Sequence, residues 1–243
     1  MSFTGRYDIM ESEISANKMK LLSALPASEI AGKRVLLRAD FNVPIKDGEV
    51  QDDTRIRETI PTIKHIVEAG GNVCLCSHLG RPDGKANQKY TLRPVAARLE
   101  KLTGAKVDFV TNFFEDKWAG GNRIVLLENT RFVAEEEDND TLFAEALAKG
   151  CDLYVNDAFG AAHRGHASTE AVAGILPHVA GFLLEKEVTT LTKIMQQPAH
   201  PVVLIVGGAK MKTKIGVLEK FVEIADTILV GGGIANTMLS AKG

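Results

Sequence analysis

Short runs of aliphatic and β-branched residues alternate along the chain with segments in which apolar residues recur every three or four positions. Runs of the first kind are typical of buried strands, and the second spacing is that of an amphipathic helix. The predicted strands are residues 34–40, 72–77, 123–128, 152–156, 202–206 and 227–230. Strand and helix in regular alternation predict an α/β protein with a doubly wound parallel sheet and right-handed crossovers.

The helical spacing is clearest between the first two predicted strands. Isoleucines recur there at steps of three and four from Ile56 to Ile66, and Gly70 and Gly71 supply the stop. The further predicted helices are residues 92–102, 142–148, 169–176, 187–195, 215–224 and 234–239. Every gap between predicted strands up to residue 156 is therefore long enough for a crossover connection.

Two prolines, Pro198 and Pro201, interrupt this alternation and predict a domain boundary between about residues 185 and 200. We expect an N-terminal arm over residues 1–28, a first domain over residues 29–185, an interdomain helix and linker over residues 186–201, and a second α/β domain over residues 202–243. This last segment has only two predicted strands and two predicted helices, fewer than a buried parallel sheet needs, so we expect that domain to be incomplete.

Composition and charge narrow the classes of function. The 243 residues are 45% hydrophobic and 25% charged, as in soluble globular proteins. Lys plus Arg is 29 against Asp plus Glu at 31, so the formal net charge of −2 argues against a nucleic-acid coat or a polybasic membrane binder. The longest apolar run, Val202–Val206, is far shorter than the ~18 residues of a membrane span. We expect a cytoplasmic protein without nucleic-acid or membrane partners, whose anion sites are local.

Arginines and other polar residues follow directly on the predicted strands. In open α/β sheets the ligand binds beyond the carboxyl ends of the strands, so these residues belong to one set. The set is Arg38, Asp40 and Asn42 at the first strand, residues 77–82 after the second, 128–132 after the third and 156–166 after the fourth. If the first strand extends to residue 42, its alternate residues point to one side.

Each of the four segments supplies an arginine, namely Arg38, Arg81, Arg131 and Arg164. Guanidinium groups gathered on one rim repel one another unless a polyanion lies between them, and their planar shape suits phosphate and carboxylate. The sequence therefore favours a site for a small anion. The alternative, in which each arginine lies on the surface and pairs with a nearby carboxylate, stays open for any one of them.

Arg55 lies in a position that is unfavourable for a cation. It falls in the first turn of the helix that Asp52, Asp53 and Thr54 are expected to begin, where the helix dipole disfavours positive charge by roughly 0.3–1 kcal/mol. A phosphate bound at the same helix terminus would reverse this balance.

Two glycine-rich turns follow the last two predicted strands. Gly207 and Gly208 precede Lys210, Lys212 and Lys214, and glycines allow backbone amides to approach an anion. The segment is not a Walker A loop, because Lys212 stands where that motif requires glycine. The second turn, residues 231–233, does not complete a dinucleotide fingerprint. Each turn alone fits tight packing as well as nucleotide contact, but together they favour a nucleotide.

Metal and covalent chemistry find little support. His78, His163 and His166 do not have the spacing of zinc ligands, and the neighbouring arginines would repel a cation, so we expect no protein metal site. No serine nucleophile elbow is present. The three cysteines, Cys74, Cys76 and Cys151, are expected to be buried reduced thiols. The acidic run 135–138 is expected to be a solvated loop surface.

Five segments closely resemble phosphoglycerate kinases, in the same order: residues 33–44, 77–82, 128–132, 156–168 and 207–214. The resemblance extends from about residue 30 to the last residue. It implies a Rossmann-like first domain that binds 3-phosphoglycerate or 1,3-bisphosphoglycerate and a second domain that binds ADP or ATP with Mg²⁺. It also implies a hinge that closes the two domains, and a monomer when full length.

The resemblance also assigns residues to each substrate. The phosphoglycerate site would comprise Arg38, Asp40, Phe41, Asn42, Arg55, His78, Leu79, Gly80, Arg81, Arg131 and Arg164. The nucleotide site would comprise Lys214, Gly207, Gly208, Lys210, Gly231, Gly232 and Gly233. The expected catalytic residues are Arg55, Lys214 and Arg38, since phosphoryl transfer needs positioning and charge neutralisation rather than a covalent partner.

The family pattern continues beyond residue 243 with further parts of the nucleotide domain. We therefore expect the chain by itself to have weak or no turnover, because the electrostatic stabilisation of the transition state would be incomplete. Two alternatives remain from the sequence. One is a phosphoglycerate-binding module without independent catalysis, and the other is a different sugar-phosphate-binding α/β protein.

Overall fold

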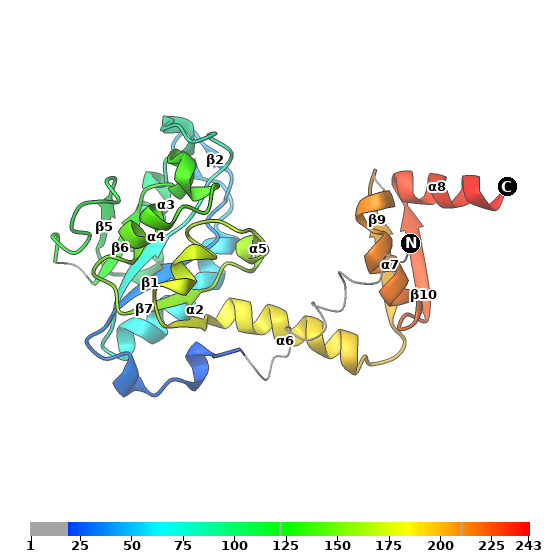
Figure 1. The fold of residues 1–243 in the computed structure, drawn as a ribbon, viewed down its shortest axis with the longest axis horizontal. Helices are drawn as coiled ribbons and strands as arrows, with labels where there is room; N and C mark the ends of the chain where they lie inside the picture. Colours follow the sequence, from blue (N-terminus) through cyan, green and yellow to red (C-terminus); the bar gives the residue numbers. More distant parts are fainter. Residues whose placement is uncertain (1–18, 122, 210) are drawn as a thin grey trace. The chain divides into compact units, whose positions relative to one another are not determined.

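A computed structural model describes residues 19–121, 123–209 and 211–243 (Figure 1). The chain divides into two compact units, Met1–Glu187 and Val188–Gly243. Most of the expected N-terminal arm, residues 1–18, lies outside the described residues. The rest of that arm contains two short 3-10 helices, η1 (Leu22–Ala24) and η2 (Ala27–Glu29), and Leu22 is fully buried in the core.

The first unit is built on a six-stranded sheet of order β5-β6-β4-β1-β7-β8, in which every neighbouring pair is parallel. Its strands in chain order are β1 (Arg34–Arg38), β4 (Asn72–Cys76), β5 (Val107–Val110), β6 (Ile124–Leu127), β7 (Leu153–Asn156) and β8 (His178–Ala180). The four central strands are the ones that the sequence predicts. They are buried on both faces, which explains their nearly continuous apolar sequences.

Two apolar cores lie on opposite faces of this sheet. Val35 and Leu37 of β1 face one core and Leu36 faces the other, as the period of two along a strand requires. Helices α2 (Thr54–Glu68) and α3 (Arg93–Thr103) cover the first face, and α4 (Thr141–Ala148) covers the second. Figure 1 shows these helices layered over the strands. The doubly wound α/β prediction is confirmed.

Several predicted elements differ from the structure. Residues 169–176 form only the short 3-10 helix η6 (Ala171–Gly174), and helix α6 (Phe182–Gln196) begins five residues before the predicted start at residue 187. The edge strands β5 and β8 were not predicted, because they are short and lack a fully buried apolar run: every residue of β5 is half-buried, and His178 of β8 is exposed. The remaining short helices are α5 (Phe159–Ala162), η3 (Gln88–Tyr90), η4 (Thr130–Phe132) and η5 (Ala134–Glu136).

A small antiparallel hairpin, β2 (Ile45–Lys46) and β3 (Glu49–Val50), was also missed. Its two-residue turn is Asp47-Gly48, and both residues have positive φ, 52° and 77°. A type I′ turn requires positive φ at both central positions, and Asp-Gly is among its preferred sequences. The signal was therefore present in the sequence.

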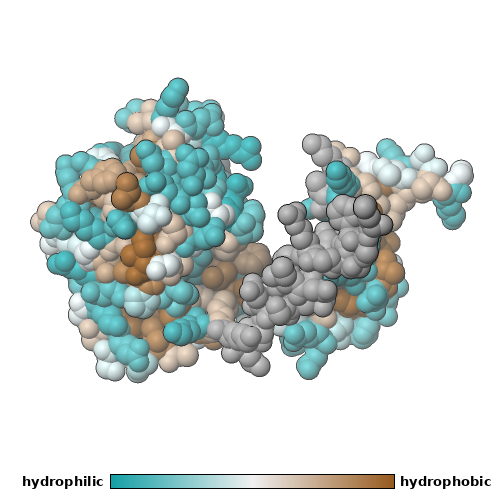
Figure 2. Space-filling model, viewed as in Figure 1, coloured by the Kyte–Doolittle hydropathy of each residue, from teal (hydrophilic) through white to brown (hydrophobic). Residues whose placement is uncertain are grey.

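The second unit contains a parallel strand pair, β9 (Val203–Gly207) and β10 (Thr227–Gly231), with η7 (Met211–Thr213), α7 (Ile215–Val222) and α8 (Gly232–Lys242). Val206, Leu218 and Ile234 form its buried core on one face of the strands. On β9, Val203 and Ile205 are 52% and 76% exposed. Figure 2 shows apolar residues on the surface of this unit.

Candidate functional site

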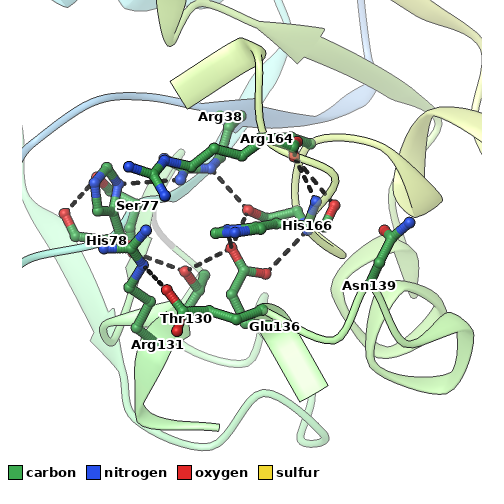
Figure 3. Close-up of polar contacts among 12 residues, drawn as sticks. Arg38, Ser77, His78, Thr130, Arg131, Glu136, Asn139, Arg164 and His166 are labelled. Carbon is green, nitrogen blue, oxygen red and sulfur yellow. Dashed lines mark hydrogen bonds and ion pairs between the residues drawn. The ribbon is translucent and has the colours of Figure 1, made fainter. Parts of the chain in front are cut away.

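The carboxyl ends of four neighbouring strands bring three arginines and a histidine together in the first unit (Figure 3). Arg38 ends β1, His78 follows β4, Arg131 lies in η4 after β6, and Arg164 follows α5 after β7. The charges of Arg38, Arg131 and Arg164 all act on the pKa of His78, so the three guanidinium groups surround this ring. We call these four residues the cation cluster.

His78 is the buried centre of the cluster, with 6% of its surface exposed. Its Nδ1 lies 3.1 Å from Nη2 of Arg38. Burial lowers the pKa of His78 to about 2, and the charges of Arg38, Arg131, Arg164 and His166 act in the same direction. The ring is therefore neutral at physiological pH and carries one N–H.

Arg38 lies beneath the rim and not on it. It is 1% exposed, its Nε donates to Ser168 Oγ at 2.8 Å, and Nη1 donates to the carbonyl of Ala39. Strand β1 ends at Arg38, so the condition under which Arg38, Asp40 and Asn42 would share one side is not met. The guanidinium of Arg38 is directed into the protein, whereas Asn42 is exposed.

Arg131 and Arg164 differ in how their charges are compensated. Arg131 is 4% exposed, its Nη1 donates to the Gly80 carbonyl at 2.9 Å, and its Nε lies 2.9 Å from Glu137 Oε1. Burial lowers the pKa of Arg131. In the described part of the chain, the guanidinium of the half-buried Arg164 has no hydrogen-bond or ion-pair partner. Arg164 therefore has its donors available for an anion.

Arg55 has a carboxylate partner of its own. Its Nη1 lies 2.5 Å from Asp40 Oδ2, and it occupies the first turn of α2, as predicted. Arg55 and Asp40 border a cavity of about 380 Å³ that is also lined by Phe159 and Lys186. Arg55 and Asp40 therefore form a second part of this edge, beside the cavity.

The loops after β1 and β4 are tied to each other. The Phe41 amide donates to Ser77 Oγ at 2.8 Å, and the Gly80 amide donates to Asn42 Oδ1 at 3.0 Å. Phe41 and Leu79 are buried in the core. These two residues therefore anchor the loops, while Asn42 and Gly80 form the rim. Arg81, the next residue, is exposed.

Sequence reasoning missed two polar residues of the site, Glu136 and Ser168, and it gave no role to Asn129, although Asn129 belongs to the predicted strand-end segment 128–132. Asn129 is fully buried and bridges the loops: its Nδ2 donates to the carbonyls of Leu79 and Tyr90, and its Oδ1 accepts from the amides of Leu79 and Arg131. The position of Asn129 directly after a predicted strand placed it in the predicted set, but only the structure shows that it bridges the loops.

The prediction for the acidic run 135–138 is wrong at Glu136, which is fully buried. Its Oε1 accepts from Ser168 Oγ at 2.6 Å and from Thr130 Oγ1 at 3.2 Å, and its Oε2 accepts from the Ser168 amide at 3.0 Å. A buried carboxylate is tolerated when such donors surround it. The neighbouring Glu135, Glu137 and Asp138 are exposed as predicted.

In the second unit the two glycine turns lie against each other. Gly207 and Gly231 end the paired strands, and the Ile234 amide donates to the Gly208 carbonyl at 3.1 Å. Gly232 has a positive φ of 62°, and a Cβ at Gly233 would approach the Ala209 carbonyl to 2.8 Å. Close packing therefore accounts for part of the glycine content. Lys214 is exposed at the start of α7, and Lys210 lies outside the described residues.

Within the described ranges, no group of three or more His, Cys, Asp or Glu side chains could hold a metal ion. Over the same residues, no helix combines the length and the apolar character that a membrane crossing needs. The three cysteines are free; Cys74 and Cys76 are buried as predicted, whereas Cys151 is half-buried. Burial raises the pKa of Cys76 to about 12 and that of Cys151 to about 11.

Fold and site together define a doubly wound α/β protein that gathers cations at the carboxyl edge of its sheet, where an anion would bind. Residues 25–243 match the family model of phosphoglycerate kinase. The chain belongs to the phosphoglycerate kinase family.

Curated relatives and solved structures agree with this assignment. The chain is 53% identical to phosphoglycerate kinase from Desulforudis audaxviator over 222 residues, covering 88% of this chain and 56% of the relative. It is 48% identical to the enzyme from Borreliella burgdorferi, covering 93% and 59%.

The structure of phosphoglycerate kinase from Coxiella burnetii matches with a TM-score of 0.80 at 39% identity, covering 93% of this chain and 57% of that one. The crystal structure from Pyrococcus horikoshii OT3 matches with a TM-score of 0.78 at 33% identity, covering 93% and 58%. The chain thus spans somewhat more than half the length of the relatives it matches.

Proposed function

We propose that the protein is a phosphoglycerate kinase that transfers a phosphoryl group between 1,3-bisphosphoglycerate and ADP, yielding 3-phosphoglycerate and ATP, in glycolysis and gluconeogenesis. The family match over residues 25–243 supports the reaction class. The cation cluster is the structural observation that carries the proposal, because it supplies the charge that a phosphorylated carboxylic acid requires.

The phosphoglycerate site would occupy the carboxyl edge of the first unit. Arg164 offers an unpaired guanidinium, Arg131 is held in place by the Gly80 carbonyl, and His78 offers one N–H. Charge-assisted hydrogen bonds to these groups are each worth about 1.5–3 kcal/mol. Asp40, Asn42, Arg55 and Arg81 would complete the rim. Phe41 and Leu79 would act from below by fixing the loops.

The nucleotide site would occupy the second unit. Lys214 would neutralise the transferring phosphates, and the turns with Gly207, Gly208 and residues 231–233 would offer backbone amides to them. Lys210 is proposed for the same role from its sequence position alone. Mg²⁺ would enter with ADP or ATP, bound to the nucleotide's own phosphates, as part of the co-substrate.

Catalysis would follow from positioning and charge neutralisation. A terminal phosphate oxygen of ADP attacks the phosphorus of the acyl phosphate and forms the new P–O bond. The bond from that phosphorus to the carboxyl oxygen breaks, and the carboxylate of 3-phosphoglycerate leaves. Negative charge spreads over the three equatorial phosphoryl oxygens, so fixed cations stabilise the transition state. Arg55 and Lys214 are the proposed catalytic cations. Arg38, at 1% exposure, would act through its neighbours rather than by touching substrate.

A phosphoglycerate-binding module without independent turnover is the second candidate. One observation favours it: all four residues of the cation cluster lie within the compact unit Met1–Glu187. We further propose that the protein acts as a cytoplasmic monomer without nucleic-acid or membrane partners, in keeping with its net charge of −2.

Calorimetry and a coupled kinase assay on the 243-residue chain test these proposals. Arg164→Gln should weaken 3-phosphoglycerate binding by about tenfold or more, corresponding to about 1.4 kcal/mol or more. Arg57→Gln is the matched control, because Arg57 is exposed and pairs with Asp53 on α2, outside the cation cluster. Because the chain by itself is expected to have weak or no turnover, the kinase assay is run with and without a separate fragment that carries the rest of the nucleotide domain. Turnover in either arm supports the kinase, and binding without turnover in both arms supports the module. Absence of 3-phosphoglycerate binding by the wild-type chain would refute both.

A further inference from the structure

A chain of buried hydrogen bonds connects Glu136 to His78 (Figure 3). Glu136 Oε1 and Ser168 Oγ are 2.6 Å apart, Ser168 Oγ and Arg38 Nε are 2.8 Å apart, and Arg38 Nη2 and His78 Nδ1 are 3.1 Å apart. Glu136 and Ser168 are fully buried and Arg38 nearly so. We call these four residues the buried relay.

The direction of each bond in the buried relay follows from the donors and acceptors available. A guanidinium has only donors, so Nδ1 of His78 accepts from Arg38. Because the ring is neutral, its single proton is then on Nε2. Ser168 Oγ accepts from Arg38 Nε and is free to donate its hydrogen to the Glu136 carboxylate.

Arg38 is a buried cation that makes no ion pair with a carboxylate among the described residues. Its nearest compensation is Glu136, one hydroxyl away. If the carboxylate contacted the guanidinium directly in the usual two-pronged manner, it would compete with His78 for the Arg38 donors. Ser168 instead links the Glu136 carboxylate to Arg38 Nε through two hydrogen bonds. Nη2 of Arg38 is thereby left to donate to the His78 ring.

Within the residues that the structure describes, Nε2 of His78 has no hydrogen-bond partner, and it is not among the buried polar atoms left unsatisfied. The groups that act on the ring electrostatically are Arg38 from β1, Arg131 from η4, and Arg164 and His166 from the loop after α5. The positive charges around this N–H favour an anionic acceptor over water.

We propose that Glu136, Ser168 and Arg38 are positioning residues that hold His78 as an Nε2–H donor to the anionic substrate. This inference rests on the proposed function for the identity of that anion, 3-phosphoglycerate. The tautomer itself is a property of the protein alone and can be measured without any ligand.

Long-range ¹H–¹⁵N spectra of histidine in the full chain test the tautomer first. For the wild-type protein we expect His78 to be neutral between pH 6 and 8, with its proton on Nε2. Arg38→Gln should alter this signature, because it removes both the donor geometry and the positive charge: the ring should titrate at higher pH or populate both tautomers. A wild-type ring protonated on Nδ1, or a spectrum unchanged by Arg38→Gln, would overturn the proposal.

Calorimetry with 3-phosphoglycerate tests the link to binding. Ser168→Ala should reduce affinity by roughly three- to tenfold, about the value of one hydrogen bond, and Ser168→Thr should restore most of it by returning the hydroxyl. Thr130→Val is the matched control, since it removes another hydroxyl from Glu136 without touching Arg38. It also removes the weaker contact of the same hydroxyl with the Ser77 carbonyl at 3.3 Å.

Two further outcomes distinguish a failure of the buried relay from a failure of the proposed function. Equal losses in Ser168→Ala and Thr130→Val would contradict the relay, because any disturbance of Glu136 would then suffice. Failure of the wild-type chain to bind 3-phosphoglycerate, with the Nε2–H tautomer present, would overturn the proposed function and leave the positioning of His78 intact.

Discussion

Replacing Gly80 by alanine should destabilise the first unit for two separable reasons. Gly80 has a positive φ of 63°, and a Cβ built there would overlap the ring of Tyr90, which packs against the main core. The backbone contribution is roughly 1–2 kcal/mol for a non-glycine residue. Overpacking against a ring that the core holds adds typically ~1–3 kcal/mol. The total loss expected for Gly80→Ala is therefore about 2–5 kcal/mol.

Gly104 provides a matched control. It has a similar φ of 71°, but a Cβ there would have no atom within 4 Å. Gly104→Ala should therefore cost only the backbone contribution, roughly 1–2 kcal/mol. Urea unfolding followed by the fluorescence of Trp118, the single tryptophan of the chain, reports on this unit.

A double-mutant cycle isolates the contact. If the ring is the obstacle, Gly80→Ala combined with Tyr90→Ala should be less destabilised than the sum of the single variants by about 1–3 kcal/mol. Additive effects, or equal losses in Gly80→Ala and Gly104→Ala, would show that the Tyr90 ring does not obstruct a Cβ at position 80.

Three further predictions concern buried groups. Burial raises the pKa of Asp157, so the folded state binds a proton more readily than the unfolded chain, and the free energy of unfolding should fall as pH rises above 3.8. Asp157→Asn should flatten this slope in urea unfolding measured at several pH values. An unchanged slope would show that the pKa of Asp157 is not raised in the folded state. Nζ of Lys117 donates to the Ala146 carbonyl at 2.6 Å near the end of α4. Lys117→Met should therefore lower the free energy of unfolding by about 1–3 kcal/mol, measured by circular dichroism melting. An unchanged stability would mean that water replaces the bond. The pKa of Cys76, raised by burial to about 12, predicts negligible alkylation of this thiol at pH 8 until urea is added. Rapid labelling of Cys76 itself in the folded protein, located by peptide mass spectrometry, would refute it.

The central strands were predictable because they are buried on both faces, and such strands consist of continuous apolar residues that can be recognised in the sequence. Edge strands leave no such run. Strand β8 has only three residues, and its His178 is exposed, so pairing with β7 rather than local sequence defines it. The hairpin at Asp47-Gly48 was predictable from its turn and was missed only because its strands are two residues long.

The gathering of cations followed from topology, since parallel strands place their carboxyl ends together. Sequence order could not say how each charge would be compensated. Arg55 and Arg131 have carboxylate neighbours, Arg164 has none among the described residues, and Arg38 reaches Glu136 only through Ser168. These partners depend on how the loops after the strands pack against one another, and on the end of β1 at Arg38.

What the sequence by itself determined was the alternation of elements, the parallel sheet and the edge at which polar residues collect, because these depend on periodicity and on the order of strands along the chain. What only the tertiary structure decided was the burial of Glu136 and the orientation of Arg38 and His78. Glu136 and Ser168 are 32 positions apart, yet they share a hydrogen bond of 2.6 Å. A polar residue's partners depend on such long-range packing, which local pattern does not encode.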